Sequence, residues 1–234
     1  MNPQSVKKLK INKLFFGSWP YKIATRIKGG NYIKIYGVDN VIKNADLYRF
    51  QRYFSYSHSQ FSNQTVTHPN NKLKEFAVLF KPYADSEIKV RAEGSHFNIF
   101  VKDVDLFNRI QQDLAEFVCE TYEPENDQQL DLLLNNQKYV LCDQLPNGQY
   151  KYKIILKHMP EQIRQNFHSW MVKYPTAQIK ASPTTEKYLA ENRYYMSDPF
   201  IYVKDNSMYM MTLLALQGYV RRIEEFVLRS SINT

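Results

Sequence analysis

The second half of the chain shows two periodicities that divide it into short elements. Period-two alternation of apolar and polar residues predicts strands at 138–144, 149–157, 177–182 and 199–205. The turn at Pro146–Gly148 predicts that the first two of these strands form a hairpin. Apolar residues at helical spacing predict helices at 160–174, within 184–192 and, as a long final helix, from Ser207 to Arg229. The main elements therefore follow the order β-α-β-β-α.

The first half has the same kinds of element with longer connections. Strands are predicted at 21–29, 74–81, 87–94, 96–103 and 118–124. Helices are predicted at 45–54 and 104–117. Each half thus combines several strands with helices that follow them.

The two halves also match in sequence. Ile99–Asp103 (IFVKD) and Ile201–Asp205 (IYVKD) agree at four of five positions. One offset of 102 residues also relates the helices that follow, pairing Leu106/Met208, Phe107/Tyr209, Leu114/Leu216, Phe117/Tyr219 and Val118/Val220. Because the strand motif and the helix after it match at the same offset, the sequence indicates a duplicated unit. Two helices on one face of an antiparallel sheet make the ferredoxin-like arrangement, so we expect an α+β protein of two tandem ferredoxin-like units.

The domain organisation predicted from this repeat has four parts. They are a basic N-terminal arm (1–19), a first unit with insertions (20–124), an acidic connection (125–137) and a second unit (138–234). The connection is expected to contain a helical turn near Leu130–Leu134.

Positive charge is concentrated at the N-terminal end. Residues 1–60 hold eleven basic residues against two acidic ones, a net +9, whereas residues 61–234 have a net charge of −1. The eight basic residues before Asp39 are interrupted by no acid. A segment that carries only positive charge indicates binding to a polyanionic partner such as nucleic acid. An anionic membrane surface is a weaker hypothesis, because Gly17 and Pro20 interrupt the apolar stretch that would insert. A solvated lysine-rich face is the alternative without a partner.

Alternation along the strands assigns residues to faces. In 21–28, Tyr21, Ile23, Thr25 and Ile27 share one face and Lys22, Ala24, Arg26 and Lys28 the other. In the matching IFVKD and IYVKD strands, one aromatic and one lysine (Phe100 and Lys102, Tyr202 and Lys204) point away from the core face. An aromatic ring beside cations on an open sheet suits single-stranded nucleic acid, because the ring stacks on a base while the cation holds a phosphate. Burial of these rings against another sheet or subunit is the competing interpretation.

These patterns predict a non-catalytic binder of single-stranded nucleic acid, with RNA slightly favoured over DNA. The expected phosphate contacts are Lys7, Lys8, Lys10, Lys13, Lys22, Arg26, Lys28, Lys34, Lys102 and Lys204. The expected stacking residues are Tyr32, Tyr36, Phe100 and Tyr202. Leu14, Phe15, Phe16 and Trp19 are expected to anchor the arm against the fold. The alternative is a structural or assembly protein, viral or phage, that oligomerises through its sheet faces.

Signatures of common enzymes are missing from the sequence. It contains no GxxxxGK[ST], GxGxxG, GxSxG, HExxH or HxH motif. Asp103 and Asp105 resemble the strand-borne DxD pair that polymerases use for metals, but the second copy has Ser207 in place of the second aspartate, and helix capping explains both copies. We therefore expect no catalytic residue, metal or cofactor, with a metal-dependent nuclease or nucleotidyl-transfer enzyme using Asp103 and Asp105 as the alternative.

Two further expectations concern chemistry and compartment. Lys157, His158 and His168 leave a metal-independent ribonuclease similar to tandem ferredoxin-like CRISPR RNA-processing enzymes as a minor alternative, although the glycine-rich loop of that family is missing. Cys119 and Cys142 have no spacing typical of zinc or disulfide frameworks. With no run of 18 apolar residues, the chain is expected to be cytoplasmic, in a host cell if it is viral.

Overall fold

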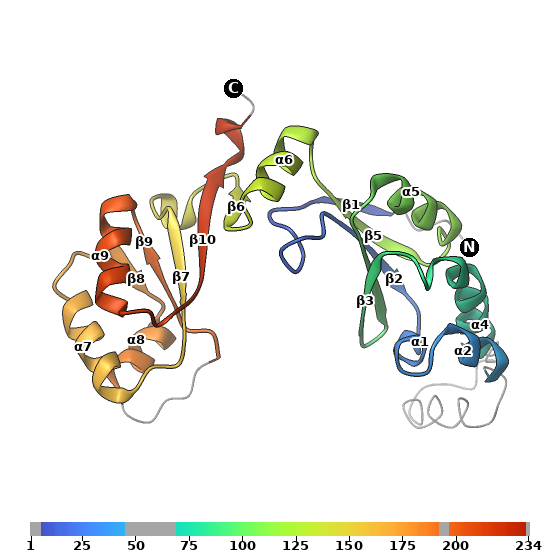
Figure 1. The fold of residues 1–234 in the computed structure, drawn as a ribbon, viewed down its shortest axis with the longest axis horizontal. Coiled ribbons are helices and arrows are strands. Elements are labelled where there is room, and N and C mark those ends of the chain that lie inside the picture. The colour runs from blue at the N-terminus through green and yellow to red at the C-terminus, as the bar shows by residue number, and fades with distance from the viewer. Residues whose placement is uncertain (1–5, 45–68, 192–196, 233–234) are drawn as a thin grey trace, which may run out of the picture. The chain divides into compact units, whose positions relative to one another are not determined.

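Two five-stranded sheets, each lined by helices, form the framework of the described part of the chain (Figure 1). The computed structural model describes residues 6–44, 69–191 and 197–232, so the helix predicted at 45–54 lies outside the described residues. The chain divides into two compact units, Met1–Asp127 and Gln128–Thr234. The predicted α+β class and tandem arrangement are confirmed, while the predicted domain limits stay a prediction.

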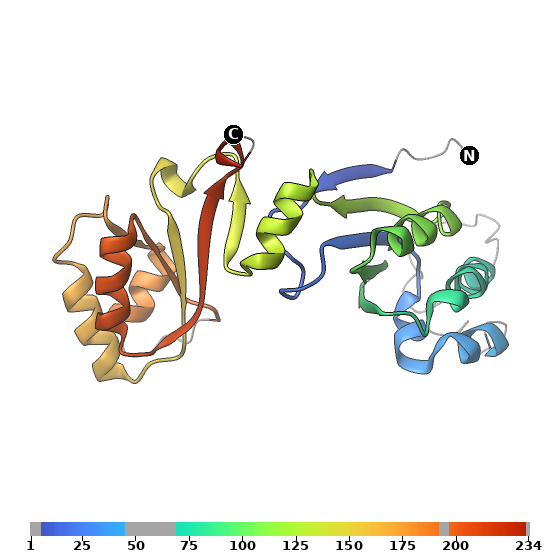
Figure 2. The same cartoon turned by 45° about the horizontal axis from the view of Figure 1, so that its top comes forward.

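The first unit is built around a mixed sheet. Its strands are β1 (Lys7–Lys10), β2 (Tyr21–Arg26), β3 (Ile88–Glu93), β4 (His96–Val101) and β5 (Val118–Glu123). They lie in the order β1-β5-β2-β4-β3, with β1 parallel to β5 and the other neighbours antiparallel (Figure 2). Its helices are α1 (Gly30–Tyr36), α2 (Val38–Asn44), α4 (Pro69–Phe80), the 3-10 turn η1 (Lys81–Tyr83) and α5 (Val104–Asp113).

The second unit repeats this arrangement. Its strands are β6 (Tyr139–Cys142), β7 (Tyr152–Leu156), β8 (Ile179–Ala181), β9 (Phe200–Val203) and β10 (Val220–Leu228). They lie in the order β6-β10-β7-β9-β8, again with one parallel pair, β6 and β10. Its helices are α6 (Asp127–Asn135), which begins at the unit boundary, α7 (Glu161–Met171), α8 (Pro183–Ala190) and α9 (Asn206–Leu216), with 3-10 turns η2 (Pro146–Gly148) and η3 (Arg229–Ser231).

One face of each sheet forms a core with the helices. Ile23 of β2 lies opposite Ile99 of β4, and both are fully buried in a cluster that also holds Phe76 of α4 and Phe107 of α5. Ile154 and Ile201 form the equivalent pair between β7 and β9, packed with residues of α7, α8 and α9. Burying a side chain of this size contributes about 1.5–3 kcal/mol. We call the opposite side of each sheet its outer face.

The repeat extends further than the matched motif. The offset of 102 residues continues to Val118 and Val220, which open β5 and β10. A second offset, of 131 residues, relates the beginnings of the two units, pairing Leu14/Leu145, Gly17/Gly148, Tyr21/Tyr152, Lys22/Lys153 and Ile23/Ile154. Equal strand order, and equal register among the antiparallel strands, show that the units share one design.

The long C-terminal helix predicted from Ser207 to Arg229 is wrong in its second half. The helix ends at Leu216, where Gln217 (φ 47°) and Gly218 (φ 86°) adopt left-handed conformations, and β10 follows. Left-handed residues after the last turn are a common way to end a helix. Apolar spacing across Ile223 and Val227 fits a strand as well as a helix.

Three further predictions about strands are wrong. The segment predicted as a strand at 74–81 belongs to α4, because Leu73, Phe76, Ala77 and Phe80 are buried at helical spacing. The predicted hairpin of 138–144 and 149–157 does not form, since β10 lies between β6 and β7. Likewise, residues 7–10 of the predicted arm form β1 within the first sheet, so neither sheet is purely antiparallel.

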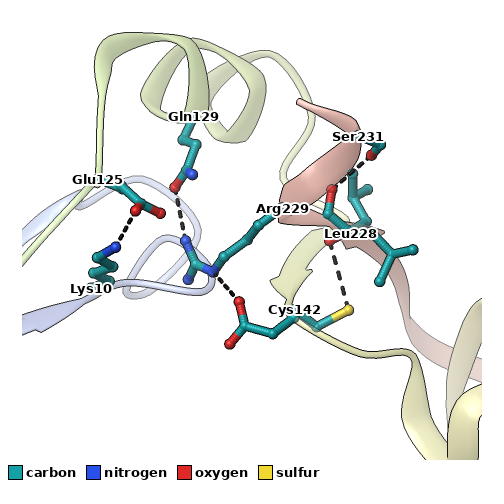
Figure 3. Close-up of polar contacts among 9 residues, drawn as sticks. Lys10, Glu125, Gln129, Cys142, Leu228, Arg229 and Ser231 are labelled. Carbon is teal, nitrogen blue, oxygen red and sulfur yellow. Dashed lines mark hydrogen bonds and ion pairs between the residues drawn. The ribbon is translucent and has the colours of Figure 1, made fainter. Parts of the chain in front are cut away.

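Arg229 joins three segments of the second unit just after β10. Its guanidinium donates a hydrogen bond to Gln129 Oε1 of α6 at 2.9 Å, and its Nε lies 3.5 Å from Asp143 Oδ1, which follows β6 (Figure 3). Gln129 is fully buried, and the Arg229 side chain is 11% exposed. Buried amides require hydrogen-bond partners, so Arg229 holds α6 against the edge of the sheet.

We predict that Arg229→Ala lowers the free energy of unfolding by about 1–3 kcal/mol, because a buried amide loses a charge-assisted hydrogen bond. The matched control is Arg221→Ala, which removes an exposed ion pair with Asp198 and is expected to cost at most about 1 kcal/mol. Urea denaturation followed by circular dichroism measures both. Equal effects of the two substitutions would contradict the role given to Arg229.

Candidate nucleic-acid interface

In each sheet, three residues that pair directly with one another on adjacent strands form a row across the strands. In the first unit, Phe100 of β4 lies between Lys89 of β3 and Lys22 of β2. In the second unit, Tyr202 of β9 lies between Lys180 of β8 and Lys153 of β7. Both rows therefore place an aromatic side chain between two lysines, at equivalent positions of the repeat.

Both rows lie on the outer face of their sheets. The residues on either side of Phe100, Ile99 and Val101, are fully buried in the helix-side core, as are Ile201 and Val203 beside Tyr202. Because successive side chains of a strand point to opposite faces, the rows point away from these cores. Figure 1 shows the helices α7, α8 and α9 gathered on one side of the second sheet. The face assignments predicted within β2, β4 and β9 are confirmed.

In the first unit the row is covered by the segment Leu14–Trp19, which we call the aromatic loop. Phe15 and Phe16 place their ring centroids 5.3 Å and 4.9 Å from that of Phe100. As a result, Phe100 is only 4% exposed. The expectation that this ring lies open is wrong, because another part of the same unit packs on it. The expectation that Leu14 and its neighbours anchor the N-terminal segment is confirmed.

Lysines of this outer face lie against aromatic rings. Their Nζ atoms are 4.4 Å (Lys22 to Tyr122), 3.7 Å (Lys89 to Phe16) and 5.0 Å (Lys102 to Trp19) from the ring centroids. Cation–π attraction of this kind is worth about 0.5–2 kcal/mol. Burial lowers the pKa of Lys22, and the charge of Glu120 acts in the opposite direction. Lys22 also lies 5.9 Å from the Phe15 ring, so Lys22 and Lys102, both expected to hold phosphates, contact rings of the aromatic loop, as does Lys89.

Tyr122 is the other ring at the edge of this surface. Its hydroxyl donates a hydrogen bond to Glu120, and burial together with that contact raises the pKa of Tyr122 to about 12. The phenol therefore stays protonated at neutral pH and adds no negative charge beside Lys22.

In the second unit the row is more accessible. Tyr202 is half-buried, and its ring lies 5.7 Å from Tyr150, 5.3 Å from Phe200 and 6.3 Å from Phe226. Lys153 lies over Phe200, with its Nζ 4.2 Å from the ring centroid. Lys180 is exposed and has no acidic partner among the described residues. This face therefore combines grouped rings with an available cation.

A carboxylate also lies within this basic surface. Glu224 of β10 is 7% exposed and has Arg222 at 3.0 Å and Lys153 at 3.9 Å. A buried charge of this kind requires compensation. The two cations together carry more charge than the carboxylate, so the surface stays net positive.

The predicted arm lysines do not form one surface. Alternation along β1 puts Lys7 on the same side as Tyr122 and Lys8 and Lys10 on the opposite side. Lys10 also forms an ion pair with Glu125 (Figure 3). Lys13 is exposed next to the aromatic loop.

The other predicted site residues are distributed over several elements. Tyr32, Lys34 and Tyr36 belong to α1, whose Ile33 packs into the helix-side core, so these three residues lie on a helix and not on a sheet face. Arg26 is exposed at the end of β2, and Lys28 is half-buried just beyond it. Lys102 pairs with Glu87, and Lys204 is exposed after β9. Their roles in binding stay predictions.

Sequence reasoning missed several residues of the two rows. Lys89 and Lys180 were overlooked because their strands look unremarkable as isolated segments. Lys153 is linked to Lys22 in the sequence only by the YKI repeat at Tyr21–Ile23 and Tyr152–Ile154. That repeat was the available signal.

Asp103, one of the two aspartates considered as metal ligands, caps α5, and its counterpart Asp205 caps α9, whereas Asp105 lies in the first turn of α5. Asp103 Oδ1 accepts a hydrogen bond from the Leu106 N–H at 2.7 Å, and Asp205 Oδ1 accepts one from the Met208 N–H at 3.0 Å. Side-chain oxygens at this position satisfy unpaired helix N–H groups. The capping interpretation is confirmed. Within the described ranges, no three His, Cys, Asp or Glu side chains gather as a metal would require.

Comparison with known proteins gives no relative: the chain matches no family model, no curated protein and no solved structure. Among the residues that the structure describes, no helix has both the length and the apolar character needed to cross a membrane.

We predict that Phe100→Ala lowers the free energy of unfolding by about 3–5 kcal/mol, because it removes a buried ring from the contact with Phe15 and Phe16. Tyr202→Ala, at the equivalent but half-buried position, should cost clearly less. Urea denaturation of both variants tests this. The packing described for the aromatic loop would be refuted by equal losses.

Proposed function

We propose that the protein is a non-catalytic binder of single-stranded nucleic acid, with the outer face of the second unit as its main surface. The observation that carries this proposal is the Lys180–Tyr202–Lys153 row. A ring between two cations supports stacking of a base and neutralisation of the phosphates on either side of it.

The surroundings of the row support the same proposal. Phe200 and Phe226 lie next to Tyr202 and offer further ring surface for neighbouring bases. Stacking contributes about 1–3 kcal/mol per base and tolerates any sequence. Lys180, exposed at the edge strand, extends the cationic border of the surface. The excess of basic residues before Asp39 adds long-range attraction for a polyanion.

The fold assignment belongs to the same proposal. The strand orders β5-β2-β4-β3 and β10-β7-β9-β8, which leave out β1 and β6, support a ferredoxin-like unit. The elements of the second unit follow the β-α-β-β-α-β connection of such a unit except that α8 is inserted between β8 and β9. We propose that each unit is a ferredoxin-like domain extended by one parallel edge strand. Such a sheet has helices on one face and leaves the other for a ligand.

We predict that the protein binds a labelled single-stranded 20-mer, as RNA and as DNA, more tightly than a duplex of equal length in fluorescence anisotropy. Tyr202→Leu should weaken binding by about 1–3 kcal/mol, equivalent to about 5- to 150-fold, whereas Tyr202→Phe should retain it because the ring remains. Absence of binding at low salt, or unchanged affinity of a folded Tyr202→Leu variant, would refute the proposal.

The phosphate contact is tested by salt titration. Lys180→Ala should weaken binding and reduce the slope of log affinity against log salt concentration by about one. The matched control is Lys187→Ala, which removes an exposed lysine of α8 outside the sheet's outer face. A control variant that lowers the slope equally would indicate binding by net charge alone.

A second candidate function, self-association, is favoured by α9. Met210, Met211 and Leu214 are 57%, 40% and 77% exposed, although large apolar side chains usually face a core. At the equivalent positions of α5 the first unit has Asn108, Arg109 and Gln112, which suit solvent. The stripe carries no charge, so a second copy of the same face would meet no repulsion.

For self-association we predict that light scattering coupled to size exclusion detects a dimer at micromolar concentration and that Leu214→Arg converts it to a monomer, because two like charges would then face each other. Leu134→Arg, at a similarly exposed position of α6, is the control and should leave the mass unchanged. A monomeric wild-type protein at all concentrations would exclude this candidate.

A further inference from the structure

Phe16 has a backbone conformation that a bulky residue rarely adopts. Phe16 has φ 50° and Gly17 has φ 77°, and the Ser18 N–H donates a hydrogen bond to the Phe15 carbonyl at 3.1 Å. Two successive residues with positive φ are the mark of a type I′ turn, which favours Asn-Gly. A side chain such as phenylalanine is strained there.

The second unit builds the same turn with the preferred residues. Asn147 has φ 50° and Gly148 has φ 73°, and the Gln149 N–H donates to the Pro146 carbonyl at 3.3 Å. The offset of 131 residues aligns Asn147 with Phe16. In the second unit the same turn therefore carries the residue pair that its backbone conformation favours.

Packing alone does not account for the phenylalanine. Phe16 meets Phe100 in an edge-to-face contact, with ring planes at 82°, but remains 48% exposed. Its neighbour Phe15 already lies on Phe100, and Leu14 anchors the loop with 7% exposure. Strained backbone conformations are concentrated at active sites and ligand-binding sites.

A cation lies directly beside this exposed ring. Lys89 Nζ is 3.7 Å from the Phe16 ring centroid, and Lys89 itself is exposed, with no acidic partner in the described ranges. Lys89 and Lys180 are equivalent members of the two rows. Phe16 and Lys89 thus repeat the combination of ring and cation that Tyr202 and Lys180 form in the second unit.

We propose that Phe16 is the base-stacking residue of the first unit, with Lys89 contacting the phosphate of the same strand. This inference rests on the proposed function and names a second site for it. The covered Phe100 acts as a positioning residue that supports the Phe16 ring from below. The ligand is a nucleobase of a single-stranded nucleic acid, and sequence preference is not expected because any base offers a flat face.

The test compares wild type with Phe16→Asn and Phe16→Tyr in anisotropy titrations of the single-stranded 20-mer. Phe16→Asn restores the favoured Asn-Gly turn, so the urea midpoint should stay close to that of wild type despite the loss of the contact with Phe100. Its affinity should fall at least about fivefold, as expected for the loss of one stacked base. Phe16→Tyr keeps the ring and should bind like wild type.

The outcomes separate the two proposals. If wild type binds and a folded Phe16→Asn variant binds equally well, the inference is overturned while the proposed function stands. If wild type binds no single strand, the proposed function fails and the inference with it. Should Phe16→Asn unfold, photocrosslinking of wild type to 4-thiouridine RNA decides instead: an adduct on the aromatic loop supports the inference, and adducts confined to the second unit overturn it.

Discussion

A pair of isoleucines at the centre of each sheet constrains everything else in its unit. Ile23 faces Ile99, and Ile154 faces Ile201, with all four side chains fully buried. Because strand side chains alternate, a slip by one residue would turn a lysine and an aromatic ring into the core. The core thereby fixes both the register and the residues of the outer face. Folding and the candidate site depend on the same contact.

The duplicated design has diverged mainly in how the outer face is covered. In the first unit the aromatic loop packs Phe15 and Phe16 on Phe100, and three lysines lie on the surrounding rings. In the second unit the corresponding turn carries Asn147, and Tyr202 keeps part of its ring accessible. The same fold thus has an accessible ring on the aromatic loop in the first unit (Phe16) and on a strand in the second unit (Tyr202).

Much of the fold was predictable where local pattern and final structure agree. Period-two alternation located β2, β4 and β9, and the offset of 102 residues revealed the tandem repeat. The prediction failed for segments whose apolar residues have a spacing that fits both a helix and a strand. The sequence pattern predicts a strand in place of α4, because the apolar residues of this segment are dense enough to fit either period. β10 was taken for a helix, although the repeat aligns its first residue, Val220, with the first residue of β5.

The sequence by itself determined which residues share a face, because that follows from the geometry of a strand and from the charge of each side chain. Only the tertiary structure decided which of those residues meet solvent. Phe100 and Tyr202 have equivalent positions and similar neighbours along the chain, yet one is 4% exposed and the other is half-buried. The difference comes from Phe15 and Phe16, far away in the sequence, since coverage depends on contacts between distant segments rather than on local pattern.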